Sequence, residues 1–122
     1  MEEAPFLNTD VDFMTRANSM LNPLDPKSGL LLIGNQGIEF RAEKGPGYIQ
    51  IPWQSITQVR VQIFFKGLYV RGFFIETSEN QLLEFIVSDA KKALRVMKSH
   101  LKREQFVSNQ SNLLQLFKRD KK

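Results

Sequence analysis

Few side chains in this sequence could carry out covalent chemistry. The 122 residues include no cysteine and one histidine, His100. Thiolate nucleophiles, disulfides and cysteine-bound zinc are therefore excluded, and a histidine-based metal site lacks its second imidazole. The residues around His100 contain no partner motif for acid–base or nucleophilic catalysis. We expect a protein that is not an enzyme, that uses no metal or cofactor, and that carries His100 on the surface of a helix.

A glycine-rich segment, residues 34–37, has the composition of a phosphate-binding loop. A P-loop requires a following helix and a lysine, whereas the residues after Gly37 alternate between apolar and charged types, which is typical of a strand. The segment is therefore interpreted as a hairpin turn in which Gly37 adopts a positive φ.

The positive charge of the chain is concentrated in its last quarter. Residues 1–88 contain 7 lysines and arginines against 10 acidic residues, whereas residues 89–122 contain 10 against 3. This asymmetry indicates an acidic partner for the C-terminal region, or a helix whose basic side chains serve only solubility.

A helix is predicted to begin after Ser88, which suits the N-cap position, with Asp89 in the first turn. Its apolar residues recur at helical spacing: Ala90, Ala93, Leu94, Met97 and Leu101. At about 100° per residue, five basic residues fall on one flank of this stripe. They are Lys91, Lys92, Arg95, Lys98 and Lys102, and we expect them to face solvent or a partner.

Residues 103–122 are interpreted as a basic tail. Within it, Leu113, Leu114 and Phe117 would form an apolar patch on a short helix, which needs a docking surface to be stable. These three residues and the five basic residues before them are the candidate partner-binding residues.

Three kinds of partner could use this basic region. Nucleic acid is disfavoured, because the helix has no aromatic residues interleaved with its basic ones and no groove-reading motif. An anionic lipid surface would attract the lysines, although the first hairpins lack a basic cluster. A protein surface is therefore the leading prediction.

The residues before the helix predict short strands separated by turns. Residues 30–33 and 38–41 form a hairpin, residues 48–51 form a strand that Pro52 ends, and residues 59–65 alternate as a half-buried strand up to Phe65. The outward residues change parity between Arg71 and Glu76, which indicates a bulge at Gly72 or a strand covered on both faces.

Aromatic residues add two expectations. Trp53 follows the strand-ending proline and is interpreted as a core residue. Phe64, Phe73 and Phe74 exceed what one face of a sheet needs, so they would either cover an interface or lie beneath the tail.

The order of elements predicts the α+β class. About seven antiparallel strands would form a strongly bent sheet, capped by the C-terminal amphipathic helix, in the outline of a pleckstrin-homology-like fold. Residues 1–102 would be this single domain. No apolar stretch reaches the roughly 18 residues of a membrane-spanning helix, and no signal peptide is recognisable. A cytoplasmic protein is expected.

Four segments resemble the ManO-like proteins in order and spacing: Gly34-Asn35-Gln36-Gly37-Ile38-Glu39-Phe40, Tyr48-Ile49-Gln50-Ile51-Pro52-Trp53, Phe65-Lys66-Gly67 and Ala93-Leu94-Arg95. These are small proteins of unknown function encoded beside mannose-family phosphotransferase system (PTS) transporters in Gram-positive bacteria. The resemblance covers residues 8–101, roughly, and brings no catalytic motif. The hairpin followed by Ile-Pro-Trp is also similar to the GRAM and pleckstrin-homology pattern.

Together these observations predict a regulatory or accessory module that binds a mannose-family PTS transporter or its cytoplasmic subunits. The transporter is implied by the resemblance alone. The alternatives are a GRAM-like module on the anionic inner face of the membrane, and a structural homo-oligomer assembled through strand edges or phenylalanines.

Overall fold

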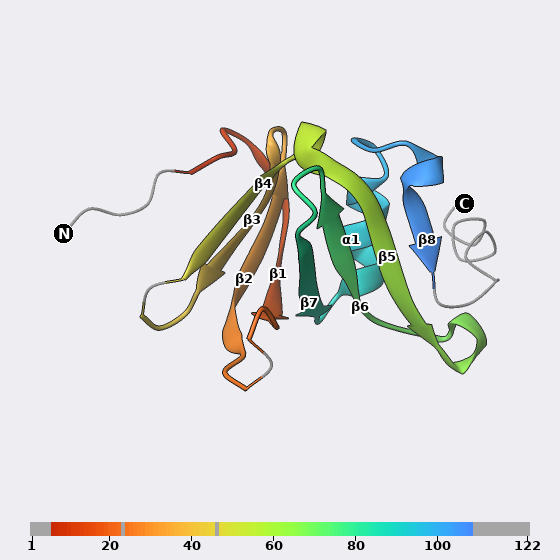
Figure 1. The fold of residues 1–122 in the computed structure, drawn as a ribbon, viewed down its shortest axis with the longest axis horizontal. Helices are drawn as coiled ribbons and strands as arrows, with labels where there is room; N and C mark the ends of the chain where they lie inside the picture. The colour runs from red at the N-terminus through yellow and green to blue at the C-terminus, as the bar shows by residue number, and fades with distance from the viewer. Residues whose placement is uncertain (1–5, 23, 46, 109–122) are drawn as a thin grey trace.

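The computed structural model describes residues 6–22, 24–45 and 47–108. They form one bent sheet of eight strands and one α-helix (Figure 1). The strands are β1 (Val11–Ser19), β2 (Lys27–Gly34), β3 (Gly37–Ala42), β4 (Tyr48–Pro52), β5 (Ile56–Phe64), β6 (Tyr69–Thr77), β7 (Leu82–Val87) and β8 (Phe106–Ser108). The helix α1 is Ala90–Met97, and three short 3-10 turns are η1 (Trp53–Ser55), η2 (Phe65–Gly67) and η3 (Arg103–Gln105).

The strands are ordered β4-β3-β2-β1-β7-β6-β5-β8 across the sheet. All neighbours are antiparallel except β5 and β8, which run parallel. The end of β1 joins the two halves, because Ala17 to Ser19 pair with β7 while the whole strand pairs with β2. The predicted α+β class and the bent sheet are confirmed.

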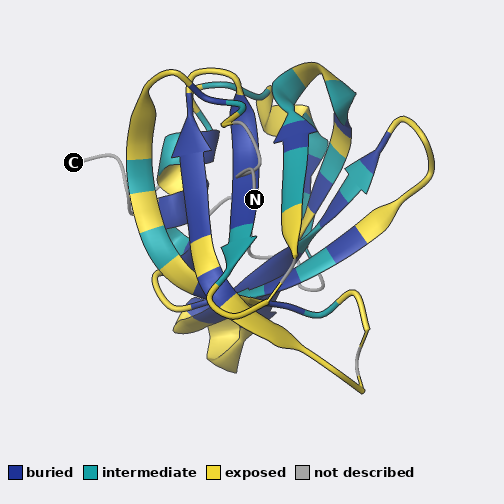
Figure 2. Cartoon of the chain, turned by 90° about the vertical axis from the view of Figure 1, so that its left-hand side faces the viewer, coloured by how far each residue is buried: buried dark blue, intermediate teal, exposed yellow. Residues whose placement is uncertain are grey.

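The core lies between the two halves of the bent sheet and is closed by α1. Alternating residues of the strands fill it, as the dark blue bands along the strands in Figure 2 show. Its largest fully buried aromatic side chains are Phe40, Phe73 and Phe85, and α1 contributes Ala90, Ala93, Leu94 and Met97. The predicted apolar stripe of the helix is therefore confirmed over these four residues.

The sheet extends beyond the predicted end of the domain. After residue 102 the chain forms η3 and then β8, which pairs with Val59 to Val61 of β5. This strand has three residues and no alternating pattern of its own, so sequence periodicity could not indicate it. It makes the strand count eight instead of about seven.

Gly37 lies where the backbone of a neighbouring strand passes close to it. Gly37 was expected to have a positive φ, but the positive-φ glycines among the described residues are Gly45, Gly47 and Gly67. Gly37 belongs to β3, where a Cβ atom would collide with the carbonyl oxygen of Ile51. Gly37 therefore allows the backbone of β4 to approach closely, which is a common reason for a glycine within a strand.

The predicted bulge in β6 is confirmed. The pairing with β5 shifts between Gln62–Gly72 and Ile63–Val70, so Arg71 is the extra residue. A Cβ atom on Gly72 would collide with the carbonyl oxygen of Phe85 in β7. The bulge explains why the outward residues change parity between Arg71 and Glu76.

Candidate functional site

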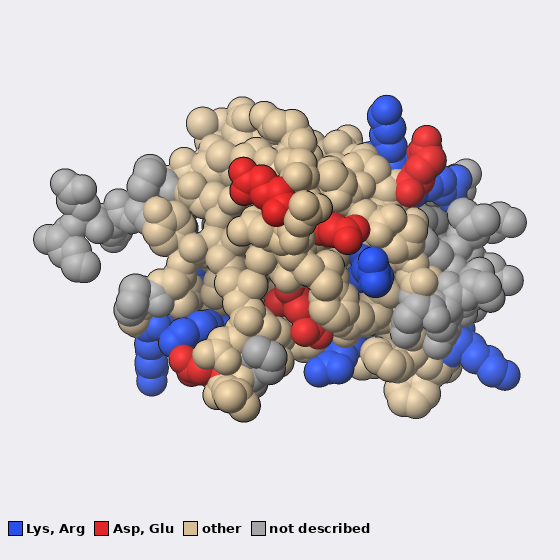
Figure 3. Space-filling model, in the orientation of Figure 1, with Lys and Arg blue, Asp and Glu red and all other residues tan. Residues whose placement is uncertain are grey.

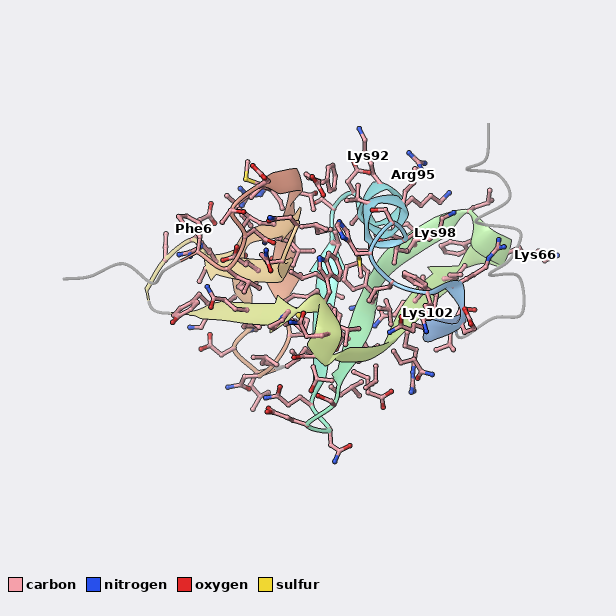
Figure 4. The ribbon with its side chains drawn as sticks, turned by 90° about the horizontal axis from the view of Figure 1, so that it is seen from above. Phe6, Lys66, Lys92, Arg95, Lys98 and Lys102 are labelled. Carbon is pink, nitrogen blue, oxygen red and sulfur yellow. The ribbon has the colours of Figure 1, made fainter. Side chains whose placement is uncertain are left out.

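The α1 cationic surface consists of Lys91, Lys92, Arg95 and Lys98. Lys92 and Arg95 are exposed, and Lys91 and Lys98 are half-buried. Figure 4 looks along the helix and shows Lys92, Arg95 and Lys98 grouped around it. The Lys92 Nζ lies 5.8 Å from the centre of the Phe13 ring, so its stem lies over β1. The helix thus presents basic side chains outside while its apolar face is buried.

The fifth predicted basic residue, Lys102, does not belong to this surface. The α-helix ends at Met97, four residues before the predicted Leu101, and Lys102 becomes the N-cap of η3. Its backbone N–H donates a hydrogen bond to Oε1 of Gln105 at 2.8 Å. Figure 4 accordingly places Lys102 beside η3, apart from α1. The helical spacing that grouped it with Lys98 does not continue past the helix end.

The start of the helix also differs by one residue from the prediction. Asp89, not Ser88, occupies the N-cap position, and its side chain makes no capping hydrogen bond. The backbone N–H of Ser88 instead donates to the carbonyl of Arg16 in β1, at 3.0 Å. The remaining candidates, Leu113, Leu114 and Phe117, lie outside the described residues.

The charged side chains of α1 are all basic. On the face shown in Figure 3, which looks at the sheet in front of α1, acidic and basic side chains are interspersed. A mixed surface of this kind produces no extended field of one sign, whereas α1 carries basic residues and no acidic one.

His100 was expected on the surface of a helix, but it belongs to a packed cluster. It follows α1 in a turn, and its ring stacks on Trp53 with 4.5 Å between centres and 9° between planes. Its Nε2 lies 3.3 Å from Oδ2 of Asp12. Trp53 is half-buried against the core and donates its indole N–H to the carbonyl of Gly34 at 2.9 Å. His100 therefore joins the end of the helix to the hairpins.

A second polar cluster surrounds Glu39, which sequence alternation placed on the exposed side of β3. Its side chain is 1% exposed because residues 6–10, here called the N-terminal arm, cover it. Asn8 donates to Glu39 Oε2 from its backbone N–H and its Nδ2, both at 3.0 Å, and Gln50 donates to Oε1 at 3.3 Å. Arg41 Nη2 lies 3.5 Å from Oε1.

These contacts shift the acidity of Glu39. Burial alone raises the pKa of its carboxyl group, but hydrogen bonds from the backbone of Asn8 and Leu7 and from the Gln50 and Asn8 side chains outweigh it. The net pKa is lowered, so the group is held as a carboxylate. Every one of its partners belongs to the fold, which indicates a structural role.

The N-terminal arm is fixed by further contacts on the same face. Phe6 lies on the Arg41 guanidinium, with 3.9 Å from Cζ to the ring centre. Asn8 Oδ1 accepts hydrogen bonds from the backbone N–H groups of Gln36 and Gly37 at 2.7 and 2.9 Å. The arm is thus tied to the hairpin turn between β2 and β3. Sequence analysis missed it, since the pattern of residues 6–10 carries no strand or helix signal.

The turn between β5 and β6 exposes a group of apolar side chains, here called the hairpin tip: Phe64, Phe65, Leu68 and Tyr69. Phe65 and Leu68 are 72% and 71% exposed, Tyr69 is 48% exposed and Phe64 is 36% exposed. Phe65 was expected to end the half-buried strand, but it belongs to η2 and has φ 56°. Lys66 and Gly67 complete this turn, as the end of the alternating pattern at Phe65 indicates.

The other phenylalanines do not extend this group into one face. Phe73 is fully buried in the core, and Phe74 is half-buried. The expected surface of Phe64, Phe73 and Phe74 is therefore wrong for Phe73. The sequence feature that could have predicted the hairpin tip is its four apolar residues on the two sides of a glycine turn.

Residues 6–22, 24–45 and 47–108 include no group of three or more His, Cys, Asp or Glu side chains that could hold a metal ion. They also include no helix that is long and apolar enough to cross a bilayer.

The comparisons with known proteins concern fold and family. A solved structure, the C-terminal domain of an unknown protein from Leishmania infantum, matches with a TM-score of 0.63 and 12% identity, over 74% of this chain and 82% of that chain. At that identity the likeness shows the fold alone. The chain matches no curated protein. Residues 4–120 match a family described as a domain of unknown function (DUF956), so the chain belongs to the DUF956 family.

Proposed function

We propose that this chain is a non-enzymatic accessory module that binds an acidic surface of a protein partner through the α1 cationic surface. The observation that carries the proposal is the division of α1 into two faces. Its apolar residues are buried in the core, while Lys92 and Arg95 are exposed beside two half-buried lysines. Exposed charges of this kind contribute little to stability, and they can contribute to an interface with a partner of opposite charge.

The partner in this proposal is a mannose-family PTS transporter or its cytoplasmic subunits, and the module acts in the cytoplasm of a Gram-positive bacterium. The support is the resemblance to the ManO-like proteins over residues 8–101, roughly. A bent sheet followed by a closing helix also supports a pleckstrin-homology-like architecture, a fold that hosts binding modules. Leu113, Leu114 and Phe117 would extend the docking surface.

The proposal is tested by reversing charge on α1. The triple variant Lys91→Glu, Arg95→Glu and Lys98→Glu is compared with the wild-type chain in affinity recovery from detergent-solubilised membranes of the native host. Mass spectrometry identifies the proteins recovered. We expect transporter subunits with the wild type and at least a tenfold loss with the variant, because like charges would then face each other across the interface.

A matched control places the same charge change on the other half of the sheet. Arg16, Lys27 and Lys44 are exposed there, and the triple change of these residues to Glu should leave recovery unchanged. Thermal unfolding of both variants checks that the fold is intact. Recovery of the transporter by the α1 variant at the wild-type level would refute this docking surface. Recovery of only this chain itself would favour the homo-oligomer.

A further inference from the structure

The hairpin tip is a protrusion with its apolar side chains directed outward. Phe65 and Lys66 both have φ 56°, and Gly67 has φ 93°. Positive φ at two non-glycine residues is uncommon and reverses the chain within η2. In Figure 1 this turn projects beyond the sheet at the lower right, and Figure 4 shows Lys66 directed away from the domain. The tip is thus convex.

The aromatic residues of the tip contact one another outside the core. The Tyr69 ring centre lies 6.4 Å from that of Phe64 and 6.5 Å from that of Phe65, both in tilted orientation. Phe64 pairs with Tyr69 across the hairpin, so both lie on the face opposite to the buried Ile63 and Val70. The three rings form one contiguous aromatic group, and Leu68, 71% exposed, lies in the same turn. Apolar groups of this kind seldom stay uncovered.

The hairpin that carries the tip is basic, although Glu84 of the neighbouring strand β7 accepts a hydrogen bond from Gln62 at 2.9 Å. Arg60, Lys66 and Arg71 are exposed, and residues 56–75 contain no acidic side chain. The nearest acid in the hairpin is Glu76, which pairs with Gln58 at the far end of β6. The tip therefore combines a convex apolar end with surrounding cations. An anionic bilayer has the complementary arrangement, with negative headgroups above an apolar layer.

We propose that the hairpin tip inserts into the interfacial region of an anionic lipid bilayer. Phe65 and Leu68 would enter the acyl boundary, Tyr69 would lie at headgroup level, and Lys66 would contact lipid phosphates. A soft surface suits a convex tip, because a protein partner would need a cavity of matching shape. Lipid binding is thereby placed on a surface different from the basic helix and tail, and it does not rest on the partner proposed above.

The test is co-sedimentation of the full chain with vesicles of phosphatidylcholine and phosphatidylglycerol. We expect sedimentation with these vesicles, little with phosphatidylcholine alone, and a decrease at high salt. The double variant Phe65→Ser and Leu68→Ser should lower the partition coefficient at least tenfold. The matched control is Leu82→Ser, because Leu82 is 50% exposed and pairs with Glu76 at the opposite end of β6.

A charge-matched pair separates insertion from general attraction. Lys66→Glu should weaken binding several-fold, whereas Lys44→Glu, in the turn between β3 and β4, should leave it nearly unchanged. Fluorescence of Phe65→Trp should shift to the blue on anionic vesicles, beyond any change of the native Trp53 signal.

Three results would overturn the proposal. The wild-type chain could fail to bind anionic vesicles. The double variant could bind as well as the wild type. Finally, sedimentation equilibrium without lipid could show a dimer that Phe65→Ser dissociates, and a second copy of the chain would then be the occupant of the tip.

Discussion

One half of the sheet carries a covered polar cluster on its outer surface, and the other half carries an exposed apolar one. On β2, β3 and β4, the N-terminal arm covers Glu39, and the polar side chains there find partners within the fold. At the end of β5 and β6, the hairpin tip leaves two side chains more than 70% exposed. The covered cluster is explained by folding alone. The exposed one is not, so a binding role is proposed for it.

The largest effect is expected from removing the carboxylate beneath the arm. Glu39→Ala leaves the Asn8 N–H groups without their acceptor and removes the carboxylate that lies 3.5 Å from Arg41 Nη2. Breaking such a buried set should lower the free energy of unfolding by about 2–4 kcal/mol. Urea denaturation measures this value.

Glu43 offers the matched control for that variant. Its ion pair with Arg16 is 3.2 Å long, but the two side chains are 50% and 61% exposed. Glu43→Ala should therefore change the free energy of unfolding by about 0.5 kcal/mol or less. Equal losses for Glu39→Ala and Glu43→Ala would mean that the arm contributes nothing to stability.

Lowering the pH should reduce the free energy of unfolding by less than Glu39→Ala does. The pKa of Glu39 is lowered below its usual value of 4.5, so the unfolded chain binds a proton at a higher pH than the folded chain does. The stability contributed by the carboxylate is complete above pH 4.5 and is lost as the pH falls through the folded-state pKa. Urea midpoints measured from about pH 6 to about pH 3 follow this loss.

Glu39→Gln keeps the shape of the side chain but cannot titrate. Its unfolding midpoint should therefore depend less on pH than that of the wild type over the acid range. If the two curves are parallel, other carboxyl groups cause the acid response, and the arm is not held by charge.

The contrast between the halves also explains what the sequence could predict. Periodicity predicted β2, β3, β4, β5 and the buried face of α1, because all of them depend on which residues fill the core. The change in which residues face outward also predicted the bulge at Gly72, since a change of face requires an extra residue. The extra residue in the structure is its neighbour Arg71. These features are local, and a single stretch of sequence contains them.

The failures involve contacts between distant segments. Glu39 looked exposed because its cover, Asn8, lies 31 residues away. His100 looked like a surface residue because Trp53 and Asp12, which contact it, come from the distant segments η1 and β1. Lys102 was grouped with Lys98 by a helical spacing that ends at Met97. Neither the arm nor the helix end has a pattern that fixes these contacts locally.

The smallest change in the free energy of unfolding is expected at the hairpin tip. This prediction tests the difference between the two halves of the sheet most directly. Phe65→Ser removes an aromatic ring that is 72% exposed and contacts Tyr69 at the end of the turn. The free energy of unfolding of this variant should differ from that of the wild type by about 0.5 kcal/mol or less, because the substitution removes little buried apolar area. A loss comparable to that of Glu39→Ala would show that the ring supports the turn, and the tip would then resemble the covered half. An unchanged fold together with lost vesicle binding would instead separate binding from folding at a single residue.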